Sequence, residues 1–206
     1  MFEKTVSQET RRVLEKIAGS GIADSFYLAG GTALALQLGH RISIDLDWFT
    51  ADSFSLEAVK KKISVLGEFK LSGEEEWTLH GALDGVKVSF LRYDYSLLYP
   101  LIGWEGIKLA DERDIAAMKI DAASSRGSKK DFIDIYYLLL KYRLPELIGF
   151  FEKKFQNIKY NKLHILKSLV FFEDAEDEPM PIMIKKTDWE AVKKKIAAEA
   201  NKILEA

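Results

Sequence analysis

Two closely spaced aspartates, Asp45 and Asp47, are the residues whose type and spacing could do chemistry. They fall in residues 42–49, where apolar side chains at 42, 44, 46 and 48 alternate with polar ones, a pattern that predicts a strand. Alternate side chains of a strand share a face, so the two carboxylates would project together from Cα atoms about 6.6 Å apart. Carboxylate oxygens at that spacing can share a hard cation such as Mg²⁺. The pair is therefore a candidate metal site.

A glycine-rich turn, Gly30-Gly31-Thr32, precedes the aspartates and is separated from them by an apolar segment of helical composition, residues 32–38. The first backbone N–H groups of a helix have no partner within the helix, and together with the helix dipole they favour a bound phosphate. A metal site and a phosphate site joined by one short helix indicate nucleotide chemistry.

The alternative for the aspartates is a half-exposed strand whose carboxylates face solvent, with Asp45 paired to Arg41 or Lys87. For an isolated Asp-x-Asp this alternative is the more frequent one. The glycine turn one helix upstream nevertheless favours the metal site over the solvent-facing alternative. The phosphate site and the aspartate pair would then lie at one end of the same supersecondary unit.

Composition excludes several classes of protein. The 206 residues contain no cysteine, which rules out a disulfide scaffold, a zinc–thiolate site and a cysteine nucleophile. The formal net charge of -2 provides no global basic field, so any contact with nucleic acid must come from a local patch. The N-terminus is charged throughout, and no stretch approaches the roughly 20 apolar residues of a membrane span. We therefore expect a cytoplasmic protein that does not enter membranes.

The first part of the chain mixes helices and strands. The two-residue sequence Asp84-Gly85 is a hairpin signal, and residues 95–106, with Pro100 and two glycines, are expected to be a loop. The expected elements are helices at 7–21, 32–38 and 55–66, and strands at 25–29, 42–49, 68–71, 77–83 and 86–93.

From residue 111 onward the pattern is helical, apart from an acidic run, residues 173–178, that we interpret as a solvated loop. Helices are expected at 111–125, 129–142, 145–155, 161–172 and 188–204. The fold class is therefore α+β, with a sheet domain over residues 1–110 and an α-helical domain over residues 111–206.

Two blocks of the chain resemble a known family. The string GGTALALQLGHRISIDLDWF is similar to the pattern GGTxLxLxxxHRxSxDLDhF of the AbiEii/AbiGii toxins, a branch of the DNA polymerase β-like nucleotidyltransferases. The string DIAAMKIDAASSRGSKKDFIDIYYLL resembles the downstream motif of that branch, DIxAMKxxAxxxRgxxKDhhDlhhL. The blocks cover roughly residues 22–49 and 111–140, and the rest of the chain carries no matching motif.

The resemblance implies a nucleotidyltransferase core with a mixed or antiparallel sheet flanked by helices, and a helical domain that completes the nucleotide cleft. Asp45 and Asp47 would bind Mg²⁺, with Mn²⁺ as a substitute, and would be catalytic together with Lys119 and Asp134. Nucleotide binding would involve the glycine turn and charged residues of both blocks, namely Gly30, Gly31, Thr32, Arg41, Ser43, Arg126, Lys130 and Asp131.

Helical spacing is consistent with this assignment. Lys119 and Arg126 are seven residues apart and share a helix face, so they can act on one anion. Asp131 and Asp134 are three apart and share a face of the next helix. The alternative is that the Lys- and Arg-rich turn between the helices is only a solvated connection and that Asp131 favours a helix start.

Ser89 is a departure from the family pattern. Many polymerase β-like enzymes place a third carboxylate on a strand after the Asp-x-Asp pair, and Ser89 occupies the position expected for it. Asp84 and Asp94 lie at the ends of that strand and could substitute only if its register differed. Without this carboxylate, the general base that would activate the incoming hydroxyl is not identified.

The function implied is Mg²⁺-dependent transfer of NMP from an NTP to an acceptor hydroxyl, with RNA, in particular tRNA, expected as acceptor and a protein hydroxyl second. The protein would be the toxin of a toxin–antitoxin or abortive-infection pair, restrained by a cognate antitoxin. The alternatives are a catalytically degenerate nucleotide-binding or protein-interaction module of the same fold, and a plain RNA-binding protein.

Overall fold

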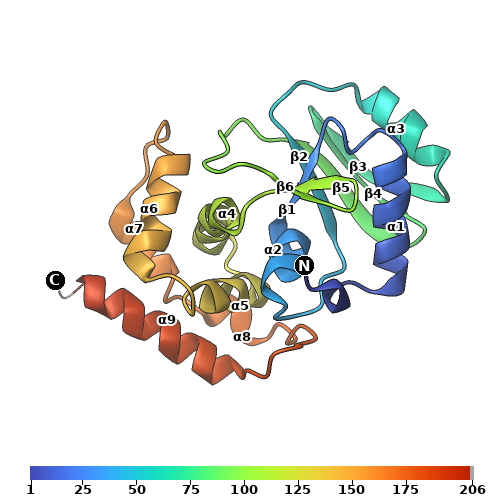
Figure 1. Cartoon of the computed structure of the whole chain (residues 1–206). Helices are drawn as coiled ribbons and strands as arrows, with labels where there is room; N and C mark the ends of the chain where they lie inside the picture. The colour runs from blue at the N-terminus through green and yellow to red at the C-terminus, as the bar shows by residue number, and fades with distance from the viewer. Residues whose placement is uncertain (205–206) are drawn as a thin grey trace. The chain divides into compact units, whose positions relative to one another are not determined.

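The computed structural model describes residues 1–204 and divides into two compact units, Met1–Asp111 and Glu112–Ala206 (Figure 1). Each unit has its own buried core, with Trp48 and Phe90 among the largest buried side chains of the first and Phe132 and Phe155 among those of the second. Within the described residues, the helices are too short or too polar for any of them to cross a membrane.

The first unit is built on a seven-stranded mixed sheet with strand order β3-β4-β5-β2-β1-β7-β6. β2 is central, pairing antiparallel with β1 and parallel with β5, and β1 is in turn parallel to β7. The expected α+β class with a mixed sheet is confirmed. The strands are β1 (Tyr27–Ala29), β2 (Leu46–Thr50), β3 (Phe69–Glu75), β4 (Thr78–Leu83), β5 (Val86–Arg92), β6 (Ile102–Trp104) and β7 (Ile107–Leu109).

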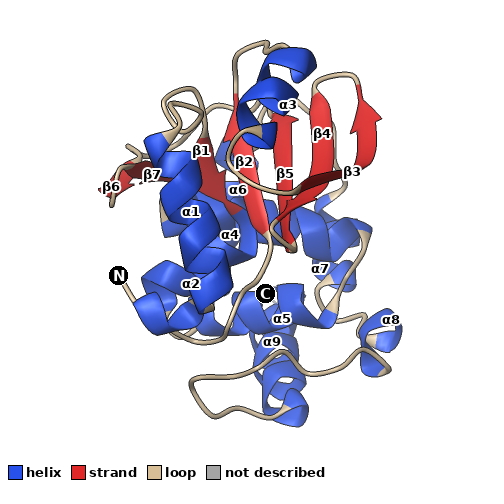
Figure 2. Cartoon of the chain, turned by 90° about the vertical axis from the view of Figure 1, so that its right-hand side faces the viewer, coloured by secondary structure: helices blue, strands red, loops and turns tan. Residues whose placement is uncertain are grey.

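The helices of this unit are η1 (Glu3–Thr5), α1 (Gln8–Gly19), α2 (Gly30–Leu38) and α3 (Leu56–Ser64). Ser7 and Ser55 cap α1 and α3, each accepting a hydrogen bond from a backbone N–H three residues on. Gly39, with φ of 67°, ends α2 in the left-handed conformation that glycine adopts without strain. Figure 2 shows α1 and α3 on one side of the strands.

The two faces of the sheet differ in polarity at its centre. Leu46 and Trp48 of β2 pair with Val88 and Phe90 of β5, and all four side chains are buried. Phe90 also contacts Phe26, with ring centroids 5.3 Å apart, and this apolar face is the one under α1 and α3. Alternation then directs Asp47 and its partner Ser89 to the opposite face.

Residues 42–45 are not part of a strand, which corrects the expected strand 42–49. β2 begins at Leu46, Ile44 is 61% exposed, and Ser43 is buried. The backbone of this segment is hydrogen-bonded elsewhere, since Ser43 N donates to Thr5 O over 2.8 Å and the Thr32 hydroxyl donates to Asp45 O. Tertiary hydrogen bonds therefore override an apolar alternation that suggested four more strand residues.

Two hairpins share the same turn geometry, and only one was expected. Asp84 and Gly85 have φ of 50° and 81°, as a two-residue type I′ turn requires, so the predicted hairpin is confirmed. Glu105 and Gly106, with φ of 45° and 79°, join β6 to β7 in a segment expected to be a loop. The expectation was wrong because three-residue strands are too short for a periodic pattern to reveal.

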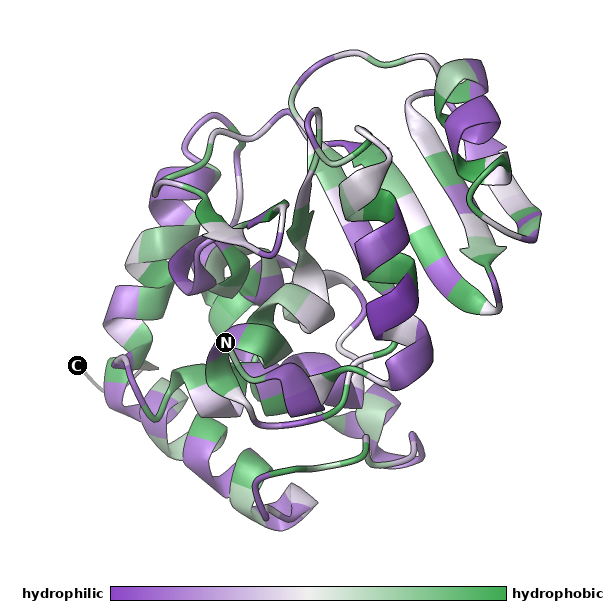
Figure 3. Ribbon diagram, turned by 45° about the vertical axis from the view of Figure 1, so that its right-hand side comes forward, coloured by the Kyte–Doolittle hydropathy of each residue, from purple (hydrophilic) through white to green (hydrophobic). Residues whose placement is uncertain are grey.

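The second unit is helical in the residues described, as expected. α4 packs against α5, α6 and α7, and α9 contacts α5 and α6. α9 is amphipathic, with Val192, Ile196 and Ala200 buried along one face, and its ribbon alternates between hydrophilic and hydrophobic residues (Figure 3). The helices are α4 (Glu112–Ser125), α5 (Lys129–Leu138), α6 (Leu144–Lys154), α7 (Lys162–Ser168), α8 (Glu173–Glu176) and α9 (Trp189–Leu204).

The acidic run, residues 173–178, is a structured segment, in contrast to the solvated loop that was expected. Four of its residues form α8, and the Glu176 carboxylate accepts hydrogen bonds from Lys193 and Trp189 of α9. The buried Lys129 ammonium donates to the backbone carbonyls of Glu176 and Glu178. Lys129 therefore holds this segment in place instead of adding charge to the protein surface.

Candidate functional site

Gly30 allows the start of α2 to approach an aspartate of β2. Gly30 has φ of 66°, and a Cβ at this position would lie 2.9 Å from Asp47 Oδ2. Any side chain would therefore collide with that carboxylate as well as straining the backbone. The glycine turn and the Asp-x-Asp pair, separated in sequence by a helix, are in contact through these two residues.

Gly31 gives similar access to two buried polar side chains. A Cβ on Gly31 would lie 2.5 Å from Arg41 Nη2 and 3.3 Å from Ser43 Oγ. Arg41 and Ser43 are 4% and 6% exposed, and Arg41 Nη1 donates to the backbone carbonyl of Ile42 over 3.2 Å. The structure thus gathers a guanidinium and a hydroxyl at the N-terminus of α2, where the helix already favours an anion.

Thr32 links α2 to the other aspartate through the backbone. The Thr32 hydroxyl is buried and donates to the carbonyl oxygen of Asp45 over 2.5 Å. In this structure the hydroxyl therefore positions Asp45, while the backbone N–H of Thr32 remains in the first turn of the helix. Asp45 and Asp47, both half-buried, flank the fully buried Leu46.

Ser89 lies beside Asp47, as the sequence comparison with the family pattern expected. The two residues are partners in the parallel β2–β5 register, so their side chains share a face. Asp84 is instead in the hairpin turn, 2.5 Å from Lys16 Nζ, and Asp94 lies beyond β5 and pairs with Arg92 over 2.8 Å. The register therefore puts a hydroxyl, and neither of these carboxylates, next to Asp47.

His80 is a residue of this region that sequence reasoning missed. It is the β4 partner of Ser89, and its Nδ1 lies 3.0 Å from Ser89 Oγ. The signal was present in the sequence, because the two-residue turn at Asp84-Gly85 fixes the pairing of the flanking strands. Counting outward from that turn pairs 83 with 86 and, three steps further, 80 with 89.

Aromatic side chains continue the face that carries Asp47. Tyr27 stacks on Phe49 with ring centroids 6.0 Å apart, Phe49 contacts Tyr93 at 5.4 Å, and Tyr93 contacts Tyr95 at 4.9 Å. Phe49 follows Asp47 by two residues on β2, so both point to the same side of the sheet. The carboxylate thus lies at the edge of an aromatic surface.

The second unit contains a separate cluster of the predicted residues. The Lys119 ammonium on α4 lies between two carboxylates of α5, 2.8 Å from Asp131 Oδ1 and 2.6 Å from Asp134 Oδ2. All three side chains are buried. Because a buried charge is costly without a partner, this arrangement holds the lysine ammonium at a defined position.

Arg126 and Ser128 also donate hydrogen bonds to the Asp131 carboxylate. The guanidinium contacts both carboxylate oxygens, over 2.9 and 3.2 Å, and the Ser128 hydroxyl donates over 2.7 Å. Burial acts to raise the pKa of Asp131, but the positive charges of Lys119 and Arg126 outweigh it and lower the pKa to about 2. Asp131 is therefore ionised, while the Arg126 side chain remains 61% exposed.

Lys130 differs from its neighbour Lys129. Lys130 is exposed in the first turn of α5, whereas Lys129 is buried and bound to the acidic segment. Of the charged residues predicted in this turn, the structure therefore places Arg126 and Lys130 at the protein surface.

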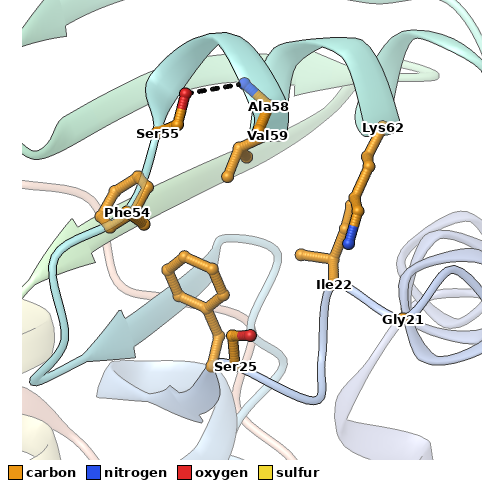
Figure 4. A pocket seen from close by; sticks show the side chains of 9 residues that line it. Gly21, Ile22, Ser25, Phe54, Ser55, Ala58, Val59 and Lys62 are labelled. Atoms are coloured by element: carbon orange, nitrogen blue, oxygen red, sulfur yellow. Dashed lines mark hydrogen bonds between the residues drawn. The ribbon is translucent and has the colours of Figure 1, made fainter.

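A pocket of about 150 Å³ lies between residues 21–26 and the N-terminal part of α3 (Figure 4). Phe26 and Phe54 line it, and Phe26 contacts Phe90 on the face under α1 and α3. Its other lining residues are Gly21, Ile22, Ser25, Ser55, Ala58, Val59 and Lys62. The pocket is therefore separate from the cluster around the glycine turn.

Comparison with known proteins gives matches over most of the chain. The model of a family described as "Nucleotidyl transferase AbiEii toxin, Type IV TA system" matches residues 12–205. The uncharacterized protein aq_aa25 of Aquifex aeolicus (strain VF5) is 43% identical over 184 residues, which is 85% of this chain and 87% of the relative.

Two solved structures resemble the chain at low sequence identity. MenT4, a nucleotidyltransferase toxin from Mycobacterium tuberculosis, has a TM-score of 0.59 at 14% identity, covering 95% of this chain and 86% of that one. JHP933 from Helicobacter pylori has a TM-score of 0.56 at 16% identity, covering 99% and 90%. At such identities the likeness concerns the fold, which is that of nucleotidyltransferases.

Proposed function

The chain belongs to the AbiEii nucleotidyl transferase toxin family, and from this premise we propose that it transfers NMP from an NTP to an acceptor hydroxyl, releasing pyrophosphate. RNA, in particular tRNA, is the proposed acceptor, and a protein hydroxyl is the second choice. The observation that carries the proposal is the contact of Gly30 with Asp47, which brings a helix start and a carboxylate pair together. A phosphate and a cation bound at these two features would be adjacent.

Asp45 and Asp47 are the proposed ligands of Mg²⁺, for which Mn²⁺ could substitute. Among the described residues there is no group of three or more His, Cys, Asp or Glu side chains arranged to hold a metal. Two carboxylates nevertheless suit Mg²⁺, which is commonly held by one or two carboxylates together with water and substrate phosphates. When bound, the ion would neutralise charge on the phosphates and favour an ionised acceptor hydroxyl.

The start of α2 is the proposed site for the NTP phosphates. The backbone N–H groups of Gly30, Gly31 and Thr32 lie in its first turn, where such groups have no partner within the helix and favour an anion. Arg41 and Ser43, gathered against Gly31, would add a cation and a hydroxyl donor. These groups would orient the α-phosphate without taking part in bond making.

We assign Lys119 and Asp134 to the same reaction, with Arg126, Lys130 and Asp131 contributing to nucleotide binding. The support is chemical: α4 and α5 bury the lysine ammonium between two carboxylates, 2.8 and 2.6 Å away, and so hold a cation at a defined position. This assignment predicts that Lys119→Ala and Asp134→Ala lose transfer activity.

A toxin of this kind is proposed to act against its own cell until a cognate antitoxin restrains it. The support is the family, whose description names a type IV toxin–antitoxin system. Expression of the chain alone is expected to arrest growth, and the Asp45→Ala variant is expected not to. Growth arrest by both the unaltered chain and the Asp45→Ala variant would show that toxicity does not depend on nucleotidyl transfer.

Transfer of label from an α-labelled NTP tests the proposed activity directly. The purified protein would be incubated with each of the four NTPs, Mg²⁺ and total tRNA, and labelled RNA or protein would be separated on gels. Asp45→Ala and Asp47→Ala should reduce labelling at least 100-fold, since each removes a ligand of the ion. Asp52→Ala, an exposed change just after β2, is the matched control and should label normally.

A non-catalytic nucleotide-binding or protein-interaction module is the second candidate, because a serine stands beside Asp47 where a third carboxylate would be expected. In that case NTP would bind, with affinity lost in Asp47→Ala, while no NTP labels any acceptor. Binding without labelling would therefore favour the module over the enzyme.

A further inference from the structure

Asp47, Ser89 and His80 form a row across the strands β2, β5 and β4. Ser89 is the register partner of both other residues, so the three side chains share one face of the sheet. Neighbouring strands are about 4.8 Å apart, which places the Ser89 hydroxyl beside the Asp47 carboxylate. The Ser89 side chain is buried, and its Oγ lies 3.0 Å from His80 Nδ1.

The row contains the elements of a proton relay. A serine hydroxyl alone is a poor proton acceptor, but it can accept one proton while passing its own to a hydrogen-bonded imidazole. Imidazole is the side chain that ordinarily changes charge between pH 5 and 8. The hydrogen bond between Ser89 and His80 therefore gives the position beside Asp47 a route for a proton that serine by itself lacks.

We propose that the Ser89–His80 pair accepts the proton of the acceptor hydroxyl, in place of a third carboxylate. This rests on the proposed nucleotidyl transfer. As the acceptor oxygen forms its bond to the α-phosphorus, its proton passes to Ser89 Oγ, and the Ser89 proton passes to His80 Nδ1. The bond from the α-phosphorus to pyrophosphate breaks, and the imidazolium later releases its proton to solvent.

Charged side chains on the same face surround the imidazole at a distance. Asp47 lies on β2 and Lys87 on β5, while Lys70 and Glu75 on β3 pair with the residues two positions away from His80 on either side. The β3 residue directly opposite His80 is Gly73, which has no side chain. The relay requires the neutral imidazole, in which Nδ1 can accept the Ser89 proton.

Kinetics of four variants test the relay, using an α-labelled NTP with total tRNA. His80→Gln and Ser89→Ala should each lower kcat about 100-fold with little change in the KM for NTP, and should remove the acidic limb of the pH profile. Combining them should cost no more than either alone, because the two residues act as one unit. His164→Gln, which changes an exposed histidine of α7, is the control and should leave the profile unchanged.

The decisive variant restores a carboxylate. In the His80→Gln background, Ser89→Asp should recover most of kcat and move the acidic limb to lower pH, since a carboxylate then accepts the proton directly. Normal kcat and an unchanged pH profile in His80→Gln would overturn the relay, while activity of the wild type would still support nucleotidyl transfer.

NMR of the His80 ring tests the relay without an activity assay, and so applies even if no transfer is detected. The ¹⁵N shifts of the His80 ring should identify the tautomer with the proton on Nε2 and Nδ1 as acceptor, and Ser89→Ala should perturb the Nδ1 shift. A proton on Nδ1 in the wild-type protein would overturn the relay. Failure of every NTP to label tRNA or protein would instead count against the proposed function.

Discussion

At the scale of single residues, two glycines without side chains determine which groups can lie close to the start of α2. Gly30 and Gly31 let Asp47, Arg41 and Ser43 approach the start of α2 more closely than a Cβ would allow. A glycine pair before an apolar helix is visible in sequence, but the residues that occupy the space it leaves are not. The contacts assign that space to one carboxylate, one guanidinium and one hydroxyl.

Gly31→Ala is expected to reduce transfer more than tenfold while the protein still folds. The added Cβ would lie 2.5 Å from Nη2 of the buried Arg41, so the guanidinium must move, and small displacements of positioning groups cost up to about 100-fold. Gly103→Ala is the control, because a Cβ there meets nothing within 4 Å. Equal transfer activities in the two variants would contradict the role given to Arg41.

Asp131 is expected to make stability depend on pH in the acid range. Its folded pKa of about 2 lies below its ordinary value of 3.8, so its contribution is present above pH 3.8 and is lost as the pH falls from about 4 through about 2. The contribution amounts to about 2 kcal/mol. Asp131→Asn should therefore be less stable than wild type at pH 7, with a difference that shrinks across this window.

Urea unfolding at a series of pH values would measure that difference. Asp52→Asn serves as the control, since Asp52 is exposed just after β2. A stability difference between Asp131→Asn and wild type that stays constant from pH 5 to pH 2 would show that Lys119 and Arg126 do not hold Asp131 as the geometry indicates.

At the scale of elements, most boundaries follow local rules and a few follow tertiary contacts. Ser7, Ser55 and Asn161 cap their helices through side-chain oxygens, and Asp84-Gly85 closes its hairpin with the expected positive φ angles. β2 begins later than its apolar alternation suggests, because Thr32 binds the backbone before it. Backbone hydrogen bonds from outside the strand thus decided where it starts.

Two glycines with open surroundings should respond to alanine in opposite directions. Gly149 lies within α6 at an ordinary φ, so Gly149→Ala should stabilise the protein by about 0.5–1 kcal/mol. Gly85 has φ of 81°, so Gly85→Ala should destabilise it by about 1 kcal/mol. Neither new Cβ meets an atom within 4 Å, so urea unfolding of the pair isolates the backbone contribution.

At the scale of the whole molecule, the chain comprises two units with separate cores. In the second, a fully buried ion pair between Asp114 and Lys154, 2.8 Å apart, joins α4 to α6. The proposed chemical groups are likewise divided, with the aspartate pair in residues 1–111 and Lys119 with Asp134 in residues 112–206. The division makes each unit testable by itself.

A fragment of residues 1–111 is expected to fold but not to transfer nucleotides, because it keeps the metal and phosphate groups and lacks Lys119 and Asp134. Circular dichroism and urea unfolding would report folding, and NTP labelling of tRNA would report activity. Full activity of the folded fragment would remove the second unit from the reaction. Residues 112–206, as a separate fragment, provide the control for folding of the helical unit.

The sequence by itself determined the fold class, the family and the main site candidates, because these depend on local signals. Each of these signals can be recognised within a few residues: glycines before a helix, two aspartates at strand spacing, and charged residues repeated at the period of a helix. The position of Ser89 beside Asp47 was expected from the resemblance to the family, and the register of β2 and β5 agrees with it.

Only the tertiary structure decided which side chains meet. Three contacts join residues 10 or more positions apart in the chain. Arg41 and Ser43 are buried against Gly31, the Thr32 hydroxyl donates to Asp45, and two carboxylates surround Lys119. No periodic pattern encodes such contacts, because they arise when packing removes polar groups from water and each must find a partner. The hydrogen bond between His80 and Ser89 differs from these contacts, because the hairpin turn at Asp84-Gly85 already pairs the two residues, and it gives the serine hydroxyl the proposed partner for a proton.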